Sequence, residues 1–166
     1  MSEDQLAGSL KKVRGKTKLR LSGHDRRDID ENDIIVFNPD VYVKNPFVQY
    51  AYRVGKRVEN EATIFYKLCG KPIIAVTGTR GKTTTANWLG HLLRPRFKAV
   101  VTGNATPGYV EPLLKVLDKI NKFSVVVNEI PSYHLEFFNK KTKAPDVAVI
   151  TNIFQDHLNR YGSLSS

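Results

Sequence analysis

The stretch IIAVTGTRGKTTT, residues 73–85, joins a run of β-branched apolar residues to a segment with helical spacing. A loop between a buried strand and a helix directs backbone N–H groups at one point, where the helix dipole also favours an anion. Gly78 and Gly81 allow a tight turn, and Lys82 can reach terminal phosphates. The hydroxyl of Thr83 can bind the Mg²⁺ that accompanies ATP. The stretch therefore predicts an ATP-binding loop made of Gly78, Thr79, Arg80, Gly81, Lys82, Thr83 and Thr84.

The loop departs from the full P-loop pattern at one position. That pattern has a glycine five residues before Gly81, and here the residue is Val76. The shorter pattern GxxGKT is less specific, and an ordinary glycine-rich turn is the alternative. Its place between the apolar run IIAV and the helical segment TTTANWL favours phosphate binding.

Short apolar runs alternate with helical segments in the second part of the chain. Strands are predicted at residues 73–76, 99–101, 123–127 and 146–150. Helices are predicted at residues 83–93, 109–120 and 132–140. The runs are of the β-branched kind found in strands covered on both faces. Strand and helix alternating at this spacing predict an α/β fold with a parallel sheet and a P-loop-type ATP-binding domain.

Polar residues follow each of the four predicted strands. Ligands of such sheets bind beyond the carboxyl ends of the strands, so these residues are predicted to converge on one site. They are Thr77 to Thr83 after the first strand, Gly103 and Asn104 after the second, Asn128 and Glu129 after the third, and Thr151, Asn152, Asp156 and His157 after the fourth.

Three of these residues are candidate ligands with plain alternatives. Glu129 ends an apolar strand, where a carboxylate is costly to bury without a partner, and Mg²⁺ is a suitable partner. A solvated strand end is the alternative. His157 is a candidate ligand because it lies at the same edge, and Asn104 is either a ligand or a turn residue. Helical spacing predicts packing roles for Tyr133, Phe137 and Phe138.

Two units are predicted along the chain. Residues 1–70 are interpreted as part of a small Rossmann-like α/β unit, and residues 71–166 as the first part of the ATP-binding domain. Lys71 and Pro72 mark the boundary between them.

The first unit is predicted to contain two strands and two helices. KKVRGKTKLR, residues 11–20, alternates apolar and basic residues and predicts a strand with one basic, solvated face. DIIVF, residues 33–37, predicts a buried strand. Helical spacing is seen at residues 46–56, with a stop at Gly55, and a second helix is predicted at residues 60–68, ending at Gly70.

Composition limits the class of protein. The 166 residues are 41% hydrophobic, which is enough for a core. The net charge of +10 suggests an anionic partner, but much of it lies in the basic segment 11–20, so nucleic acid is not the favoured partner. The single cysteine, Cys69, fits a reducing compartment. No apolar run is long enough for a membrane span and the start lacks a signal peptide, so a cytoplasmic location is expected.

Four stretches in order resemble the Mur ligases, the ATP-dependent enzymes that build the peptide of bacterial peptidoglycan. They are VTGTRGKTTT, GNATPG, NEIPSYHLE and ITNIFQDHLNRYGS. Within the family, the resemblance is greatest to the branch that adds D-glutamate to UDP-N-acetylmuramoyl-L-alanine. Residues 34–65 also resemble the end of that branch's first domain, which holds the UDP-sugar.

The resemblance implies a mechanism and a set of roles. ATP phosphorylates the acceptor carboxylate, and the amine of the amino acid attacks the acyl phosphate to give an amide, ADP and phosphate. By motif position, Lys82 stabilises charge on the transferred phosphoryl group. Thr83 and Glu129 hold one Mg²⁺, and His157 helps to hold a second. The residues that fall where the family contacts the acceptor are Asn104, Ser132 and His134.

Some positions depart from the family pattern and keep alternatives open. Arg80 stands where asparagine is commonest, and Pro131 and His134 replace the usual Ser and Gln. A related ligase, of the poly-γ-glutamate or folylpolyglutamate synthetase type, is therefore an alternative. The resemblance covers only part of a complete enzyme, so a further C-terminal segment or second chain is expected. An inactive nucleotide-binding fragment is the remaining alternative.

Overall fold

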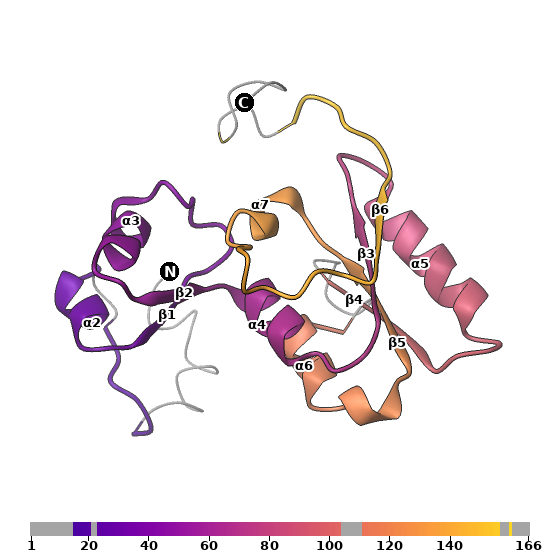
Figure 1. Ribbon diagram of the computed structural model, residues 1–166, viewed down its shortest axis with the longest axis horizontal. Coiled ribbons are helices and arrows are strands. Elements are labelled where there is room, and N and C mark those ends of the chain that lie inside the picture. The colour runs from indigo at the N-terminus through magenta and orange to yellow at the C-terminus, as the bar shows by residue number, and fades with distance from the viewer. Residues whose placement is uncertain (1–14, 21–22, 104–110, 157–159, 161–166) are drawn as a thin grey trace.

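The computed structural model describes residues 15–20, 23–103, 111–156 and 160. Two sheets follow one another along the chain, each with helices beside it (Figure 1). The helices are α2 (Arg26–Asp30), α3 (Pro46–Arg53), α4 (Glu61–Leu68), α5 (Lys82–Leu93), α6 (Leu113–Leu117), the 3₁₀ helix η1 (Ile120–Lys122) and α7 (Ser132–Leu135). The strands are β1 (Ile34–Val36), β2 (Arg57–Glu59), β3 (Ile73–Thr77), β4 (Ala99–Gly103), β5 (Val125–Glu129) and β6 (Val147–Ile150).

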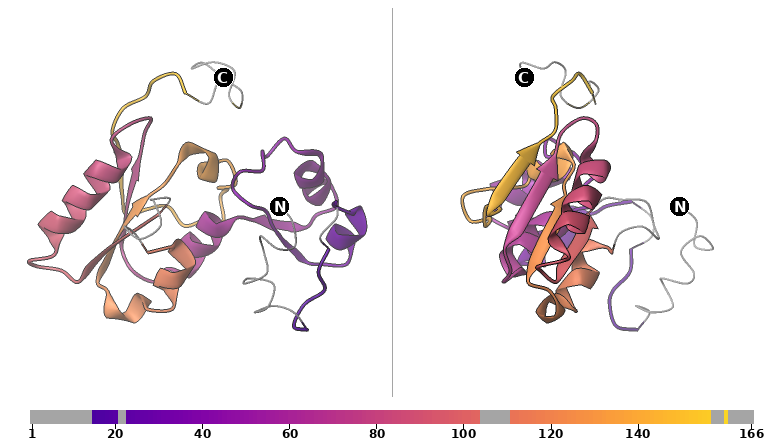
Figure 2. Two further views of the ribbon diagram at one scale, coloured as in Figure 1. Left: turned by 180° about the vertical axis from the view of Figure 1, so that it is seen from behind. Right: turned by 90° about the vertical axis from the view of Figure 1, so that its right-hand side faces the viewer.

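The larger sheet is parallel, as predicted, with the strand order β4-β5-β3-β6. Its register brings Glu129, at the end of β5, opposite Val76 on one side and Gly103 on the other. Thr77, at the end of β3, lies opposite Ile150 of β6. The carboxyl ends of all four strands therefore meet at one edge of the sheet, which Figure 2 shows from two sides.

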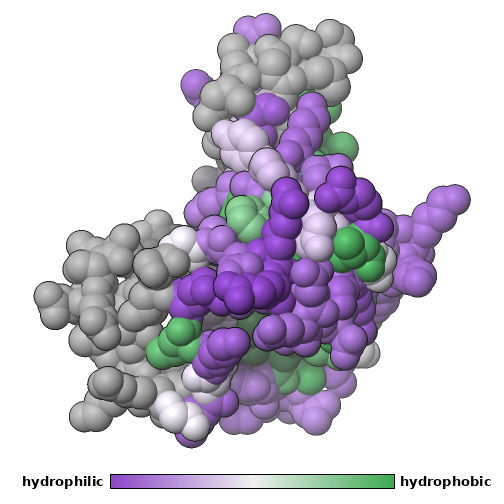
Figure 3. Space-filling view, turned by 90° about the vertical axis from the view of Figure 1, so that its left-hand side faces the viewer, coloured by the Kyte–Doolittle hydropathy of each residue, from purple (hydrophilic) through white to green (hydrophobic). Residues whose placement is uncertain are grey.

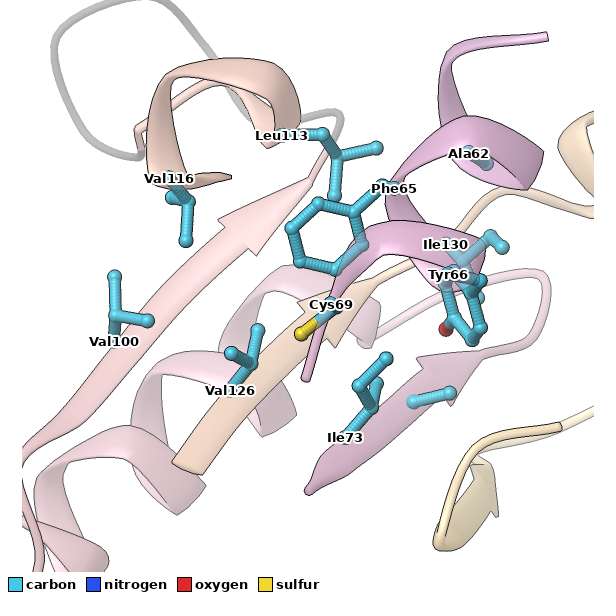
Figure 4. Packing of buried hydrophobic residues seen from close by; sticks show 11 residues of the cluster. Ala62, Phe65, Tyr66, Cys69, Ile73, Val100, Leu113, Val116, Val126 and Ile130 are labelled. Carbon is cyan, nitrogen blue, oxygen red and sulfur yellow. The ribbon is translucent and has the colours of Figure 1, made fainter. Parts of the chain in front are cut away.

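Helices cover both faces of this sheet because successive strand residues point to opposite sides. On one face, α4 and α6 pack on Ile73, Val100 and Val126, and Phe65 lies in the middle of this cluster (Figure 4). On the other face, α5 covers a second cluster. Its buried members are Val76, Ala86, Val101 and Val127.

The prediction that the strands are covered on both faces is confirmed for β5 and wrong for β6. Every residue of β5 is buried. In contrast, Val147 and Ile150 of β6 are 51% and 62% exposed. The reason is the position of β6 at the edge of the sheet, where among the described residues it pairs with β3 alone.

The first unit contains a two-stranded parallel sheet, in which Ile35 of β1 lies opposite Val58 of β2. The predicted strand at residues 33–37 is present, but the prediction that it is buried is wrong. Ile34 and Val36 are 48% and 57% exposed, whereas Ile35 and Phe37 are partly buried and pack against the core cluster of this unit. That cluster is Ile29, Val48, Ala51, Val58 and Phe137.

The predicted basic strand at residues 11–20 is wrong for its described part, residues 15–20, which are exposed and form no strand. Arg20 pairs with α2 instead, since its Nε donates to Asp28 Oδ2 at 2.6 Å and its Nη2 donates to Asp28 Oδ1 at 3.0 Å. A segment with alternating apolar and polar residues forms a β-strand only when a neighbouring strand pairs with it. Here Arg20 forms an ion pair with α2 instead. Figure 3 shows that the side of the molecule bearing this unit is largely hydrophilic where it is described.

The helices α3, α4 and α5 confirm the predictions for their segments, and their starts have clear causes. Asn45 caps α3 through Phe47 N, and Pro46 occupies the first turn. Asn60 and Thr63 form a reciprocal capping box at α4, with distances of 2.8 and 2.9 Å.

Two predicted helices are shorter than expected. In place of the helix at 109–120, α6 begins after Pro112 and ends at Leu117, and η1 follows it. In place of the helix at 132–140, α7 ends at Leu135. The chain leaves α7 so that Phe137 can enter the core of the first unit, where it stacks on Phe37 at 6.5 Å between ring centroids. Tertiary packing therefore overrides the helical spacing.

The predicted boundary at residue 70 stays a prediction. Helix α4 lies before it in sequence, yet Phe65, Tyr66 and Cys69 belong to the same core cluster as Ile73 of the larger sheet. The packing roles predicted for Phe137 and Phe138 are confirmed, because Phe137 is buried and Phe138 packs against the cluster around Phe65. In the described residues, none of the helices combines the length and apolar character needed to cross a membrane.

Candidate nucleotide-binding site

The loop at residues 78–81 connects the end of β3 to the start of α5, as the sequence predicts. Gly81 is the N-cap of α5 and has a φ of 79°, and no side chain caps this helix end. Within the described part of the chain, the first backbone N–H groups of α5 thus have no capping side chain, and the positive end of the helix dipole lies at the same point. This arrangement suits a phosphate group.

Gly78 is required by the way the loop packs. Its φ is 131°, and a Cβ at this position would lie 2.2 Å from Thr151 Oγ1 and 2.8 Å from the Asn152 carbonyl oxygen. The loop therefore rests directly on the residues that follow β6. Glycine is the residue that allows this approach.

Hydrogen bonds hold the loop against the segment after β6. Thr79 N donates to the Asn152 carbonyl at 3.1 Å, and Arg80 N donates to Asn152 Oδ1 at 3.0 Å. Thr151 Oγ1 donates to the Arg80 carbonyl at 2.6 Å. Phe154 N donates to Thr79 Oγ1 at 2.9 Å. Thr151 and Asn152, which the sequence placed at this edge, thus shape the loop.

Lys82 is the first residue of α5, and its side chain folds back over the preceding loop. Its Nζ donates to the carbonyls of Gly78 at 2.8 Å and Thr79 at 3.0 Å. An ammonium held at these carbonyls stands close to the backbone N–H groups of the loop. A terminal phosphate bound there could take the ammonium as its partner, since Lys is a mobile point charge on a flexible stem.

Glu129 ends β5 next to the loop. Its side chain belongs to a buried residue, with 6% exposure, and its strand position is opposite Val76 of β3. Gly103, with a φ of 138°, passes so close that a Cβ would lie 2.1 Å from the Glu129 carbonyl oxygen. The carboxylate and the loop therefore come from neighbouring strands at one sheet edge.

Sequence reasoning missed a buried hydrogen-bond network behind Glu129. Tyr66 of α4 donates its hydroxyl to Asn128 Oδ1 at 2.9 Å, and burial raises the pKa of Tyr66. Asn128 Nδ2 donates to the carbonyls of Thr102 at 3.3 Å and Glu129 at 3.2 Å. The network joins the ends of β4 and β5 to α4. The sequence signal for this network is the polar side chain of Asn128 directly after an apolar run, because a buried amide needs hydrogen-bond partners.

A cavity of about 330 Å³ lies beside the loop. It is lined by Thr79, Arg80, Phe154, Gln155 and Asp156. Its polar and charged lining comes from the loop after β3 and the segment after β6. Among the described residues, no group of three or more His, Cys, Asp or Glu side chains forms a ready metal site.

The residues predicted to contact the acceptor differ in their surroundings. Ser132 begins α7 and is exposed. His134 is buried, and its Nδ1 is, among the described residues, a buried side-chain atom without a hydrogen-bond partner. Burial lowers the pKa of His134 to about 4, so the ring is neutral near pH 7. Asn104 and His157 lie outside the described residues.

Residues 76–166, which begin within β3, match the model of the Mur ligase middle domain. The chain belongs to the Mur ligase family. The loop, Glu129 and the segment after β6 all lie within the matched residues.

Two curated Mur ligases are similar over nearly the whole chain. UDP-N-acetylmuramoylalanine–D-glutamate ligase of a Roseiflexus species is 37% identical over 98% of this chain and 34% of its own length. The enzyme of that name from Geobacter metallireducens is 34% identical over 97% of this chain and 35% of its own length. This chain therefore spans about a third of the length of these relatives.

A solved Mur ligase structure gives a looser match. The MurF ligase of Thermotoga maritima, solved in complex with ADP, is 23% identical with a TM-score of 0.47. The match covers 84% of this chain and 39% of that one. A similarity of this size describes only a general likeness of the two chains.

Proposed function

We propose that this chain forms the nucleotide-binding part of an ATP-dependent ligase that adds D-glutamate to UDP-N-acetylmuramoyl-L-alanine. The observation that carries the proposal is the phosphate loop at the end of β3, with Glu129 at the end of the neighbouring β5. The curated relatives named for this reaction support the choice of acceptor and amino acid.

The residues of the loop would bind and orient ATP. Backbone N–H groups at the start of α5 would hold the phosphates, and Lys82 Nζ would leave the Gly78 and Thr79 carbonyls to contact the transferred phosphoryl group. This positive charge would stabilise the transition state in which the acceptor carboxylate takes the phosphoryl group. The amine of D-glutamate would then attack the acyl phosphate and release phosphate.

Oxygen donors at this edge fit Mg²⁺, which prefers them. The Thr83 hydroxyl and the Glu129 carboxylate would hold one ion with the nucleotide, and the ion would neutralise charge that develops on the phosphates. His157, which lies outside the described residues, is proposed to help with a second ion. These ligand assignments stay predictions from the family motifs.

The acceptor side of the site is proposed to include Asn104, Ser132 and His134. The first unit, residues 1–70, is proposed to be the part that holds the UDP-sugar, and the protein is proposed to act in the cytoplasm. Neutral His134 would offer a hydrogen bond where the family has Gln, because burial lowers its pKa. This difference is also what favours the alternative of a related glutamate ligase with another acceptor.

Phosphate release tests the proposal in a ligase that contains this segment together with the remaining domains. Release is expected to require ATP, UDP-N-acetylmuramoyl-L-alanine and D-glutamate together. Release that is indifferent to the sugar nucleotide would reject the proposed acceptor, and a folate or γ-glutamyl acceptor would then support the related ligases. For the 166-residue chain alone, binding of ATP with a weak dependence on salt would argue against a general polyanion-binding module.

A further inference from the structure

Arg160 follows β6 in sequence and is half-buried as a whole, but its charged side chain is almost fully buried. Its side chain is 7% exposed. Nε donates to Glu136 Oε1 at 2.5 Å, and Nη2 donates to Glu136 Oε2 at 2.9 Å. This fork is the geometry in which arginine binds a carboxylate most specifically, and lysine cannot reproduce it.

The same guanidinium also contacts the first unit. Its Cζ lies 4.3 Å from the ring centroid of Tyr42 and 5.4 Å from that of Tyr133 on α7. Nη2 donates to the carbonyls of Pro39 and Val41, each at 3.4 Å. Arg160 is therefore held between the loop that follows β1 and the helix α7.

Glu136 completes the contact from the other side. Its Oε2 accepts from Val43 N at 3.4 Å, and its neighbour Phe137 lies in the core cluster of the first unit. Glu136 is at the C-cap of α7, which follows β5 and the candidate ligand Glu129. We call Arg160, Glu136 and Tyr42 the arginine clasp.

The other end of the segment that carries Arg160 holds the phosphate loop. Thr151 and Asn152 contact the Arg80 carbonyl, and Phe154 N donates to Thr79. Residues 151, 152 and 154 thus contact the candidate ATP loop, and Arg160, further along the sequence, contacts the first unit.

We infer that Arg160 is a positioning residue, whose clasp fixes the first unit relative to the phosphate loop. The catalytic consequence rests on the proposed function, in which the first unit holds the acceptor and the loop holds ATP. Phosphoryl transfer needs the reacting atoms in line and close together, so the two units must keep a fixed spacing. The structural part of the inference does not depend on any reaction.

The chain offers a direct measurement of that spacing. Trp88 is the single tryptophan, lies on α5 and is 63% exposed, so it can serve as an energy donor. Lys44 is exposed in the first unit, and Lys44→Cys would carry the acceptor dye, since the native Cys69 is buried. Time-resolved energy transfer then reports the distribution of distances between the two units.

The clasp predicts a narrow distribution in the labelled 166-residue chain and a broader or shifted one after Arg160→Met. Arg96→Met is the matched control. Arg96 follows the C-terminal end of α5, is exposed, and makes no contact with the clasp among the described residues. Arg160→Lys keeps the charge without the fork and should broaden the distribution while circular dichroism stays native. If Arg160→Met fails to fold, the distance distribution of Arg160→Lys alone tests the inference. Unchanged distributions in folded Arg160→Lys and Arg160→Met would overturn the inference.

A kinetic measurement separates positioning from simple stability. In the complete ligase, Arg160→Lys is expected to lower kcat about tenfold or more, since small misplacements of reacting groups cost this much. The KM for ATP should stay within about twofold, because the clasp contacts among the described residues involve α7 and the segment after β1 and none of them involves residues 78–81. A rise in the KM for ATP with unchanged kcat would contradict positioning. A ligase inactive even without substitution would reject the proposed function and leave the distance measurement to judge the clasp.

Discussion

Replacing Gly78 with alanine should destabilise the fold and remove nucleotide binding at the same time. The Cβ of alanine would lie 2.2 Å from Thr151 Oγ1 and 2.8 Å from the Asn152 carbonyl oxygen, on a backbone with a φ of 131°. Backbone strain of this kind costs about 1–3 kcal/mol. Moving Thr151 also breaks the hydrogen bond that its hydroxyl donates to the Arg80 carbonyl, worth about 1 kcal/mol. The expected loss of stability is therefore about 3 kcal/mol.

Gly55→Ala serves as the control that separates the cost of a positive φ from the cost of a steric clash of the new Cβ. Gly55 has a φ of 74° with no atom within 4 Å of its Cβ position, so alanine there should cost only about 1 kcal/mol. Urea unfolding followed by circular dichroism measures both variants, and calorimetric titration with ATP and Mg²⁺ measures the loop. Gly78→Ala should bind ATP at least about tenfold more weakly than the unchanged chain, which is a loss of about 1.4 kcal/mol. Equal stabilities of the two variants, with ATP affinity retained in Gly78→Ala, would refute the described loop.

Three further outcomes follow from the site. Lys82→Ala should abolish measurable ATP affinity in the same titration, because its ammonium lies at the Gly78 and Thr79 carbonyls within the loop, and unchanged affinity would contradict the assignment. Tyr66→Phe should cost about 1–2 kcal/mol in urea unfolding by leaving Asn128 Oδ1 without its donor, whereas exposed Tyr52→Phe should cost nearly nothing. The stability of the chain should fall as pH drops from about 6.5 to about 4, since unfolding lets His134 take up a proton that the fold excludes. His134→Gln should flatten that part of the pH profile, and an unaltered slope would remove His134 as its cause.

The local features of the loop could be predicted because they depend on neighbours in sequence. A β-branched run, two glycines and Lys-Thr at the start of a helical segment specify strand, turn and helix within residues 73–85. The parallel sheet follows for the same reason, since helices between successive strands return the chain to the same end. The position of Glu129 at the end of β5 could also be predicted, because a carboxylate after an apolar run marks the end of a strand, while its role as a ligand stays a prediction.

Predictions failed where distant segments decide the outcome. The alternating residues 15–20 lack a strand to pair with, and Arg20 turns to Asp28 of α2 instead. Helix α7 stops at Leu135 because Phe137 contributes to a core built mainly by the first unit. The exposure of β6 depends on its place at the sheet edge, which strand order determines and strand composition does not.

The sequence by itself determined the fold class, the loop between β3 and α5 and the family, because each rests on short patterns that fold locally. The tertiary structure alone decided what holds the loop in place. Gly78 is needed because Thr151 and Asn152, 73 residues or more further along the chain, pack directly against it. Arg160, Glu136 and Tyr42 likewise come from three separate segments of the chain and meet only in the folded protein. Such contacts depend on how segments far apart in the sequence pack together, which a local pattern of residues does not specify.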